Sequence, residues 1–323
     1  MAPLPFNLPL VQFLADHRNV FLTKLFLAAS FLGSTECYIL IAILIYVVWD
    51  KKLAIRLSVL VLLTMSLNDV LKNIIRNPRP FIREGTYLKK WAVSASSAKT
   101  LAAEYSTPSG HAMGASAFYS YLCAFIGNRY VRIVAVLAII LIGLSRPYLG
   151  VHYAEDIVIG WAIGLSVALA AARFKARMTS IWNNRSYTQQ VGIAIVASMA
   201  LCLPAMAING WRMDGQPCAL LGYAGFLTGI VIARPLELRT VNFDPRSSSV
   251  AIKLLRYVLS IGMVISVLLI FDKVLGAMAD KFDMLGYALQ YLRYAVAGIV
   301  GIFLAPLIFS KMKLAETQPA GMD

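Results

Sequence analysis

Residues 108–156 read PSGHAMGASAFYSYLCAFIGNRYVRIVAVLAIILIGLSRPYLGVHYAED, with polar clusters flanking two apolar runs. The apolar runs cover about 108–126 and 130–144. A helix needs about 20 predominantly apolar residues to cross a bilayer. Consecutive spans run in opposite directions, so the start of the first and the end of the second share one membrane side. The segment therefore predicts a pair of membrane helices with polar clusters gathered at one face.

The composition of the whole chain supports this interpretation. Of 323 residues, 59% are hydrophobic and 14% are charged, and the mean hydropathy is +0.71. A soluble domain is usually about 45–50% apolar and about 25% charged. We therefore predict an all-α integral membrane protein, a multi-pass helical bundle with about nine spans. The predicted spans are about 36–49, 57–75, 108–126, 130–144, 156–172, 191–209, 217–233, 254–271 and 294–309.

The chain divides into three predicted segments. Residues 1–34 mix Leu and Phe with charged residues, which favours an interfacial amphipathic helix over a span. Residues 35–175 form a membrane core that carries the polar clusters, and residues 176–323 add transmembrane helices of unassigned role. A homo-oligomer through these C-terminal helices is left open. His17 lies in the first segment without a partner motif, and we expect it at the surface.

The net charge of +14 raises the question of whether the protein binds nucleic acid. The basic residues lie in loops between apolar runs, which is typical of membrane topology, and we expect a lipid bilayer and no nucleic acid as partner. Cytoplasmic loops carry an excess of Lys and Arg. We therefore predict that the polar clusters lie on the extracytoplasmic side, in a bacterial cytoplasmic membrane. The predicted cytoplasmic turns are 50–56, 127–132, 173–188 and 234–256.

Three cations stand where membrane proteins usually avoid charge. Lys72 and Arg79 belong to KNIIRNPRP at residues 72–80, which ends an earlier apolar run, and Arg146 follows the run at 130–144. Cations gathered at one membrane edge repel one another unless an anion offsets the repulsion. The planar fork of arginine matches phosphoryl oxygens, and lysine adds a point charge. We predict a phosphate site, and expect Asp69 to pair with Lys72 one helical turn away.

The cluster PSGH supplies the start of a helix. A hydroxyl residue at 106 or 107 is expected to cap it, with Pro108 in the first position. The amides near Ser109 and Gly110 would then point out of the helix N-terminus and bind an anion, and Gly110 lets the backbone approach the ligand. His111 lies in the same first turn, next to the bound group.

The last cluster supplies a nucleophile. His152 and Asp156 are four residues apart, and a carboxylate on one ring nitrogen leaves the other nitrogen free to attack phosphorus. His111 can then protonate the leaving oxygen while the cations stabilise the phosphoryl oxygens. This chemistry predicts no metal and no cofactor. In the loop before the PSGH cluster, we expect a mobile flap at 93–103. We expect Arg76, Arg83, Lys89 and Lys90 to act as interfacial anchors or headgroup contacts.

Taken together, Lys72-x6-Arg79-Pro80, Pro108-Ser109-Gly110-His111 and Ser145-Arg146-x5-His152-x3-Asp156 resemble the signature of the type 2 phosphatidic acid phosphatases. These enzymes belong with the bacterial acid phosphatases and vanadium haloperoxidases, and no signature position departs from the pattern. The resemblance covers roughly residues 50–175. It implies a phosphohistidine on His152, a general acid at His111 and orientation of His152 by Asp156. It also implies phosphate binding by Lys72, Arg79, Ser109, Gly110 and Arg146.

We therefore predict a membrane enzyme, a phosphoric monoester hydrolase that acts on the phosphate or diphosphate of a membrane lipid. Phosphatidate, phosphatidylglycerophosphate, polyprenyl diphosphate and sphingoid-base phosphate all stay open as substrates. One alternative is a lipid phosphotransferase that uses the same phosphoenzyme. Another, of a different class, is a lipid transporter or scaffold on an inactive phosphatase frame.

Overall fold

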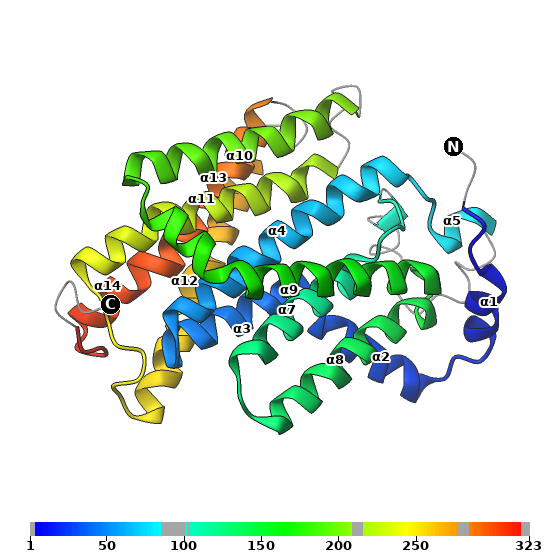
Figure 1. Cartoon of the computed structure of the whole chain (residues 1–323), viewed down its shortest axis with the longest axis horizontal. Coiled ribbons are helices and arrows are strands. Elements are labelled where there is room, and N and C mark those ends of the chain that lie inside the picture. The colour runs from blue at the N-terminus through cyan, green and yellow to red at the C-terminus, as the bar shows by residue number, and fades with distance from the viewer. Residues whose placement is uncertain (1–3, 85–100, 103, 209–215, 277–283, 318–323) are drawn as a thin grey trace. The chain divides into compact units, whose positions relative to one another are not determined.

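The computed structural model describes residues 4–84, 101–102, 104–208, 216–276 and 284–317. The described part is helical apart from turns, loops and one isolated bridge between Phe243 and Thr317 (Figure 1). Most of the predicted flap at 93–103, with Lys89, Lys90 and the side chain of Arg83, lies outside the described residues. The helices are α1 (Leu8–Asp16), α2 (Val20–Leu32), α3 (Thr35–Val48), α4 (Lys51–Ile75), α5 (Pro80–Glu84), α7 (Gly110–Phe125), α8 (Arg129–Tyr148), α9 (Ala154–Asn183), α10 (Tyr187–Ile208), α11 (Gln216–Thr240), α12 (Val250–Gly276), α13 (Met284–Ile299), η2 (Val300–Leu304) and α14 (Ala305–Lys311).

The multi-pass membrane fold predicted from the sequence is confirmed, but its span count is not. Each of the predicted apolar runs overlaps a helix. Within the described residues, 6 helices are long and apolar enough to cross a membrane, or up to 7 if α2 and α3, bent by 56°, form one broken span. Helix α7, predicted as a full span, has only 16 residues. The helix begins at Gly110 because Ser109, and not a residue before Pro108, is its N-cap.

The single interfacial helix predicted before residue 35 is replaced by two helices. Helix α1 ends at Asp16 and α2 begins at Val20. The side chain of Asn19 causes the restart, because its oxygen accepts from the Leu22 amide at 2.9 Å and caps α2. His17 is exposed in the break between them, as predicted.

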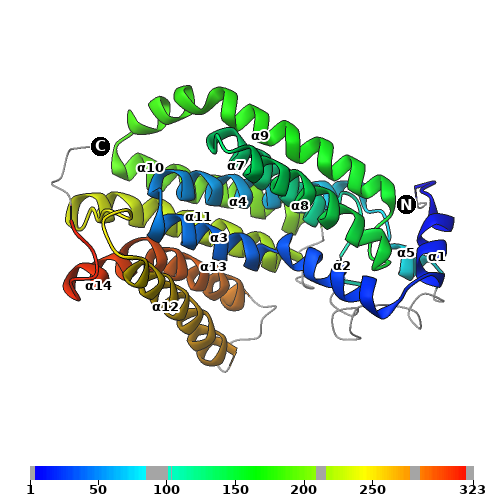
Figure 2. The ribbon, with the colours of Figure 1, turned by 90° about the horizontal axis from the view of Figure 1, so that it is seen from below.

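The described chain forms two compact units. The first holds residues 1–38 and 63–176, and the second holds 39–62 and 177–323. In the first unit, α8 packs against both α2 and α7, and Figure 2 shows α7 and α8 side by side. In the second unit, α11 packs against α10 and α13. The polar clusters all lie in the first unit. The sequence-based division at residues 34 and 175 stays a prediction.

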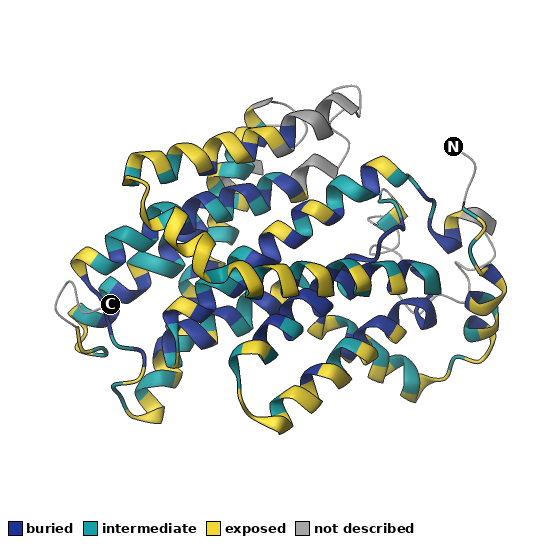
Figure 3. Ribbon diagram, in the orientation of Figure 1, coloured by how far each residue is buried: buried dark blue, intermediate teal, exposed yellow. Residues whose placement is uncertain are grey.

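Apolar side chains on the outside of the helices fit a bilayer rather than water. Helix α8 exposes Ile133, Val134, Val136 and Leu137, each more than half exposed. Figure 3 marks exposed positions of every residue type along α8 and α9. Exposed apolar surface of this extent is expected where lipid covers a helix.

In the second unit, small residues and a buried ion pair hold the helices together. A side chain at Gly229 of α11 would lie 2.2 Å from the Ala295 carbonyl oxygen of α13, so the two backbones touch. The fully buried Glu237 carboxylate accepts from Lys51 Nζ and from Arg234 Nη1, both at 2.9 Å. These contacts give the buried charges of Lys51 and Glu237 a structural role.

In the first unit, two glycines set the distance between α9 and α7. A Cβ at Gly160 would lie 2.9 Å from the Ser109 carbonyl oxygen, and one at Gly164 would lie 2.2 Å from the Met113 carbonyl oxygen. The Ser116 hydroxyl also donates to the Trp161 carbonyl oxygen at 2.9 Å. The close approach positions the start of α9, with Asp156, beside the start of α7, with His111.

We expect Gly164→Val to destabilise the protein by about 1–3 kcal/mol, because the added methyl groups force the two backbones apart. The shift also moves the polar clusters relative to each other, so any activity of the site should fall with stability. Thermal unfolding in detergent measures the loss. The matched control is Gly262→Val on α12, where an added Cβ meets nothing within 4 Å. Equal melting temperatures for the two variants would contradict the packing argument.

Candidate active site

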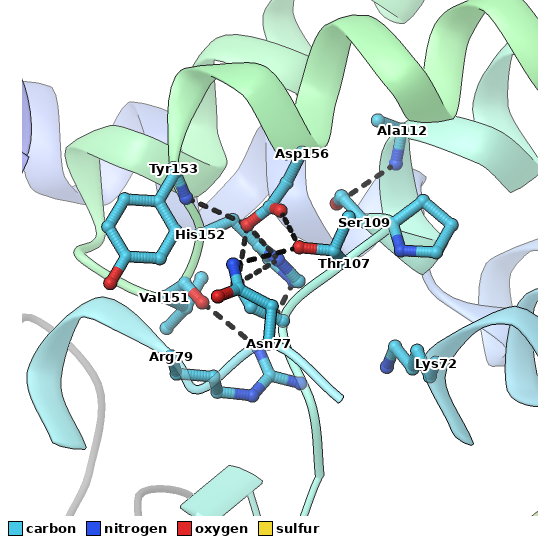
Figure 4. Close-up of polar contacts among 12 residues, drawn as sticks. Lys72, Asn77, Arg79, Thr107, Ser109, Ala112, Val151, His152, Tyr153 and Asp156 are labelled. Carbon is cyan, nitrogen blue, oxygen red and sulfur yellow. Dashed lines mark hydrogen bonds and ion pairs between the residues drawn. The ribbon is translucent and has the colours of Figure 1, made fainter. Parts of the chain in front are cut away.

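The polar clusters predicted from the sequence come together in the first unit, and most of their residues are buried. Figure 4 shows the contacts around His152 and Asp156. They come from the end of α4, the loop before α5, the starts of α7 and α9, the end of α8 and the turn before α9. Arg79 is 1% exposed and Asp156 is fully buried. Lys72, Ser109, Gly110, Arg146 and His152 are also buried, and His111 is partly buried.

Lys72 and Arg79 share one carboxylate oxygen. Glu104 Oε2 accepts from Lys72 Nζ at 2.9 Å and from Arg79 Nη2 at 3.0 Å. The main-chain oxygen of Glu104 accepts from Arg79 Nε at 3.1 Å. The predicted partner of Lys72 was Asp69, and that prediction is wrong: among the described ion pairs, that of Lys72 is with Glu104. The loop before α7 brings this glutamate to the end of α4, which sequence spacing does not encode.

Arg79 also fixes the protonation of His152. Its Nη1 donates to the Val151 carbonyl oxygen at 3.0 Å and lies 3.1 Å from His152 Nε2. A guanidinium has only donors, so Nε2 must accept and the ring proton must sit on Nδ1. The lone pair of Nε2 therefore points at a cation that could bind a phosphoryl oxygen (Figure 4).

The other side of the His152 ring faces Asp156. Asp156 Oδ2 and the Ser106 hydroxyl each lie 3.3 Å from Nδ1, and Ser106 Oγ donates to Asp156 Oδ2. Thr107 Oγ1 donates to Asp156 Oδ1 at 2.5 Å, and the Tyr153 amide donates to Oδ2 at 2.9 Å. The carboxylate is held on both oxygens and in turn orients the imidazole. The prediction that residue 106 or 107 caps the helix is wrong, because both hydroxyls donate hydrogen bonds to the Asp156 carboxylate.

The start of α7 differs from the prediction in three details. Ser109 is the N-cap, with its hydroxyl accepting from the Ala112 amide at 3.5 Å. The Ser109 amide, expected to be free for an anion, donates to the Asp156 carbonyl oxygen at 3.2 Å. Asn68 packs so closely against Gly110 that there is little room for a side chain at position 110: an added Cβ would lie 3.0 Å from Asn68 Oδ1. The close approach predicted for a ligand is therefore made by a side chain of α4.

His111 lies in the first turn of α7, as predicted. It is near enough to Arg146, Lys72 and Arg79 for the charges of these three cations to act on it. Its ring also packs next to Gly33, where an added Cβ would be 3.4 Å from its Cδ2. The imidazoles of His111, in α7, and His152, in the turn before α9, therefore lie near the same cations.

Arg146 reaches the site from the last turn of α8. Its Nη1 donates to the Ser30 hydroxyl of α2 at 2.5 Å. Its Nε is buried and has no hydrogen-bond partner among the described residues. Leaving a guanidinium N–H unpaired in a buried place is costly, about 1–3 kcal/mol or more for a charged group. A bound anion would remove that cost.

Charge and burial set the protonation states outside the spans. Burial lowers the pKa of His152 well below its usual value, and the charges of Arg79, Arg146 and Lys72 lower it further. The ring is therefore neutral near pH 7, as a nucleophile must be. Burial alone would raise the pKa of Glu104, but the charges of Lys72 and Arg79 outweigh it and lower the pKa to about 2.

Three contributors to the site were not identified from the sequence as parts of it. Glu104 was not assigned to the site from the sequence, and Ser106 and Thr107 were interpreted as helix caps. A fourth, Asn77, was not considered: its side-chain amide donates to Thr107 Oγ1 at 3.0 Å. The sequence did place Glu104, Ser106 and Thr107 shortly before Pro108, and Asn77 close to Arg79. This proximity to the motifs does not specify which side chain each residue contacts in the folded protein.

The fold and the site define a class: a multi-pass helical membrane protein with buried cations around an imidazole and its carboxylate partner. Family comparison agrees with this class. Residues 53–180 match the PAP2 superfamily, and residues 221–317 match the PAP2 superfamily phosphatase, transmembrane extension. The chain belongs to the PAP2 superfamily, in its membrane-integral lipid phosphatase branch.

Individual relatives are distant. The chain is similar to sphingosine-1-phosphate phosphatase 1 of Mus musculus, at 26% identity over 90% of this chain and 73% of that protein. It is also similar to undecaprenyl-diphosphatase of Sulfolobus acidocaldarius, at 25% identity over 53% and 79%. Among solved structures, a transmembrane PAP2 type phosphatidylglycerolphosphate phosphatase from Bacillus subtilis matches 53% of this chain and 84% of its own, with 25% identity and a TM-score of 0.42.

Proposed function

We propose that this membrane phosphatase hydrolyses the phosphate or diphosphate of a membrane lipid through a phosphohistidine on His152. One observation carries the proposal. The lone pair of His152 Nε2 lies against Arg79, inside a buried group of cations that includes Lys72 and Arg146. Such a group is stable in a membrane protein only when anions balance it, and a phosphoryl group fits both the charge and the donors.

In the proposed first step, the lone pair of His152 Nε2 attacks phosphorus and the bond from phosphorus to the lipid oxygen breaks. Arg79 transfers its Nη1 donor from Nε2 to a phosphoryl oxygen, together with Lys72 and Arg146. His111, which takes up a proton from water once the bound phosphate anion offsets the surrounding cations, gives that proton to the leaving lipid oxygen. Asp156 and Ser106 keep the Nδ1 proton of His152 in place and offset the positive charge that the ring gains.

In the proposed second step, water attacks phosphorus and the bond from phosphorus to Nε2 breaks. His111, now neutral, accepts a proton from the water, and His152 regains its lone pair. Phosphate and the dephosphorylated lipid are the products. A phosphotransferase would differ only in using another hydroxyl in place of water.

The lipid is proposed from the relatives and the membrane helices. The relatives act, by their names, on sphingosine 1-phosphate and undecaprenyl diphosphate. Because the spans place the site within a bilayer protein, the phosphate should arrive on a lipid tail. The candidates are phosphatidate, phosphatidylglycerophosphate, sphingoid-base phosphate and polyprenyl diphosphate.

A phosphate-release assay on these four lipids with purified protein tests the proposal. We expect free phosphate from at least one lipid without any added acceptor. Release only after adding an alcohol or sugar would show a transferase instead. No release from any of the four, together with lipid flipping by a His111→Ala/His152→Ala double variant, would show a transporter.

We further propose that the site faces the extracytoplasmic side of a bacterial cytoplasmic membrane. In that orientation the turn after α9 is cytoplasmic. Asn184, exposed in this turn and followed by Arg185 and Ser186, forms a glycosylation acceptor. Expression in a glycosylating host should leave Asn184 unmodified. An acceptor sequence engineered into residues 85–90 should be glycosylated, and the reverse pattern would invert the topology.

A further inference from the structure

Glu104 binds the two cations in the way a phosphoryl oxygen would. A single oxygen, Oε2, accepts from Lys72 Nζ at 2.9 Å and from Arg79 Nη2 at 3.0 Å. Both cations are buried, whereas the side chain of Glu104 is 39% exposed. The carboxylate therefore enters the cation pair from the solvent side, as an incoming anion would.

A phosphoryl group cannot take both donors while Oε2 keeps them. The substrate must therefore displace this oxygen from Lys72 Nζ and Arg79 Nη2. Displacement leaves Arg79 anchored, because its Nε still donates to the main-chain oxygen of Glu104 at 3.1 Å. The exposed carboxylate can turn toward water without disturbing that anchor.

Charge adds a second effect. Among the described residues of the site, Lys72, Arg79 and Arg146 carry positive charge, and Glu104 and Asp156 carry negative charge. Repulsion between Glu104 and a bound anion grows with the charge of the anion. A diphosphate, with more negative charge than a phosphate monoester, is therefore disfavoured more strongly.

We propose that Glu104 is an internal competitor that weakens phosphate binding, speeds product release and selects monophosphate over diphosphate headgroups. The proposal rests on the proposed function only for the identity of the product. Its physical core is the affinity of the Lys72–Arg79 pair for anions, which can be measured without turnover.

The test is titration of inorganic phosphate and of pyrophosphate into the full-length protein in detergent, followed by calorimetry. For Glu104→Gln we expect phosphate to bind about fivefold to tenfold more tightly, because the variant removes one partly exposed negative charge at contact distance from the bound anion. Pyrophosphate should gain more than phosphate, by a further factor of about three. Where turnover is measured, phosphate should inhibit Glu104→Gln at correspondingly lower concentration.

Two variants control the experiment. Glu155→Gln removes a nearby carboxylate that instead accepts from the Asn7 amide at 2.9 Å, and its phosphate affinity should match the wild type. Glu104→Asp keeps the charge and should stay within about threefold of the wild type. The Glu155 control separates local competition from a general change in protein charge.

The inference is decided by whether Glu104→Gln raises or lowers the affinity of the protein for phosphate. If Glu104 only holds Lys72 and Arg79 in place, Glu104→Gln will bind phosphate and pyrophosphate more weakly or equally, and the inference falls. Tighter phosphate binding without lipid hydrolysis in the wild type would support the inference while refuting the proposed function. Lipid hydrolysis with unchanged anion affinity in Glu104→Gln would do the reverse.

Discussion

The His152→Ala variant is expected to lose lipid phosphate hydrolysis by at least about 10⁴-fold, as happens when a nucleophile is removed from a site whose other groups remain. The reason is the position of Nε2, whose lone pair lies 3.1 Å from the Arg79 donor that would bind the phosphoryl group. Methyl at position 152 offers no electron pair. Steady-state phosphate release from the best lipid of the panel measures the loss.

The matched control for His152→Ala is His17→Ala. His17 is an exposed histidine of the same unit, and its Nδ1 lies 2.8 Å from the Phe13 carbonyl oxygen. This variant should keep the wild-type rate. Retention of more than about a tenth of that rate by His152→Ala would exclude His152 as the nucleophile.

The second large effect is expected for His111→Ala, with a loss on the order of 100-fold or more on lipid substrates. Its imidazole lies in the first turn of α7, close enough to Arg146 for the charge of that cation to act on it. A lipid alkoxide is a poor leaving group and needs a proton as it departs. An aryl phosphate such as p-nitrophenyl phosphate has a much better leaving group and needs little help.

The comparison of substrates makes this prediction specific. His111→Ala should lose less than about tenfold on p-nitrophenyl phosphate while losing its activity on lipids. A merely structural role of His111 would reduce both activities by the same factor. Equal losses would therefore assign the general acid to another group.

Much of the fold followed from the sequence, since each apolar run predicted as a span overlaps a helix. The count of spans did not follow, because hydropathy does not show that α2 and α3 bend by 56° or that α7 begins at Gly110. The break between α1 and α2 at Asn19 could not be predicted from hydropathy either, because it depends on a local hydrogen bond from the Leu22 amide to the Asn19 side chain.

The candidate site was predicted as a set of residues but not as a set of contacts. Spacing along one helix suggested Asp69 for Lys72, whereas the loop before α7 delivers Glu104. The two hydroxyls before Pro108 looked like helix caps, yet both donate to Asp156, which belongs to α9. Contacts between distant segments depend on packing, here on the glycines of α9, and no local pattern encodes them.

The most direct test of the mechanism is to trap the covalent intermediate. Protein reacted with ³²P-labelled lipid phosphate for a few milliseconds is quenched in alkali, which preserves phosphohistidine, and the labelled peptide is sequenced by mass spectrometry. The account predicts label on His152 in the wild type, and none in His152→Ala. Label on another residue, or full turnover with no labelled protein at any time, would contradict it.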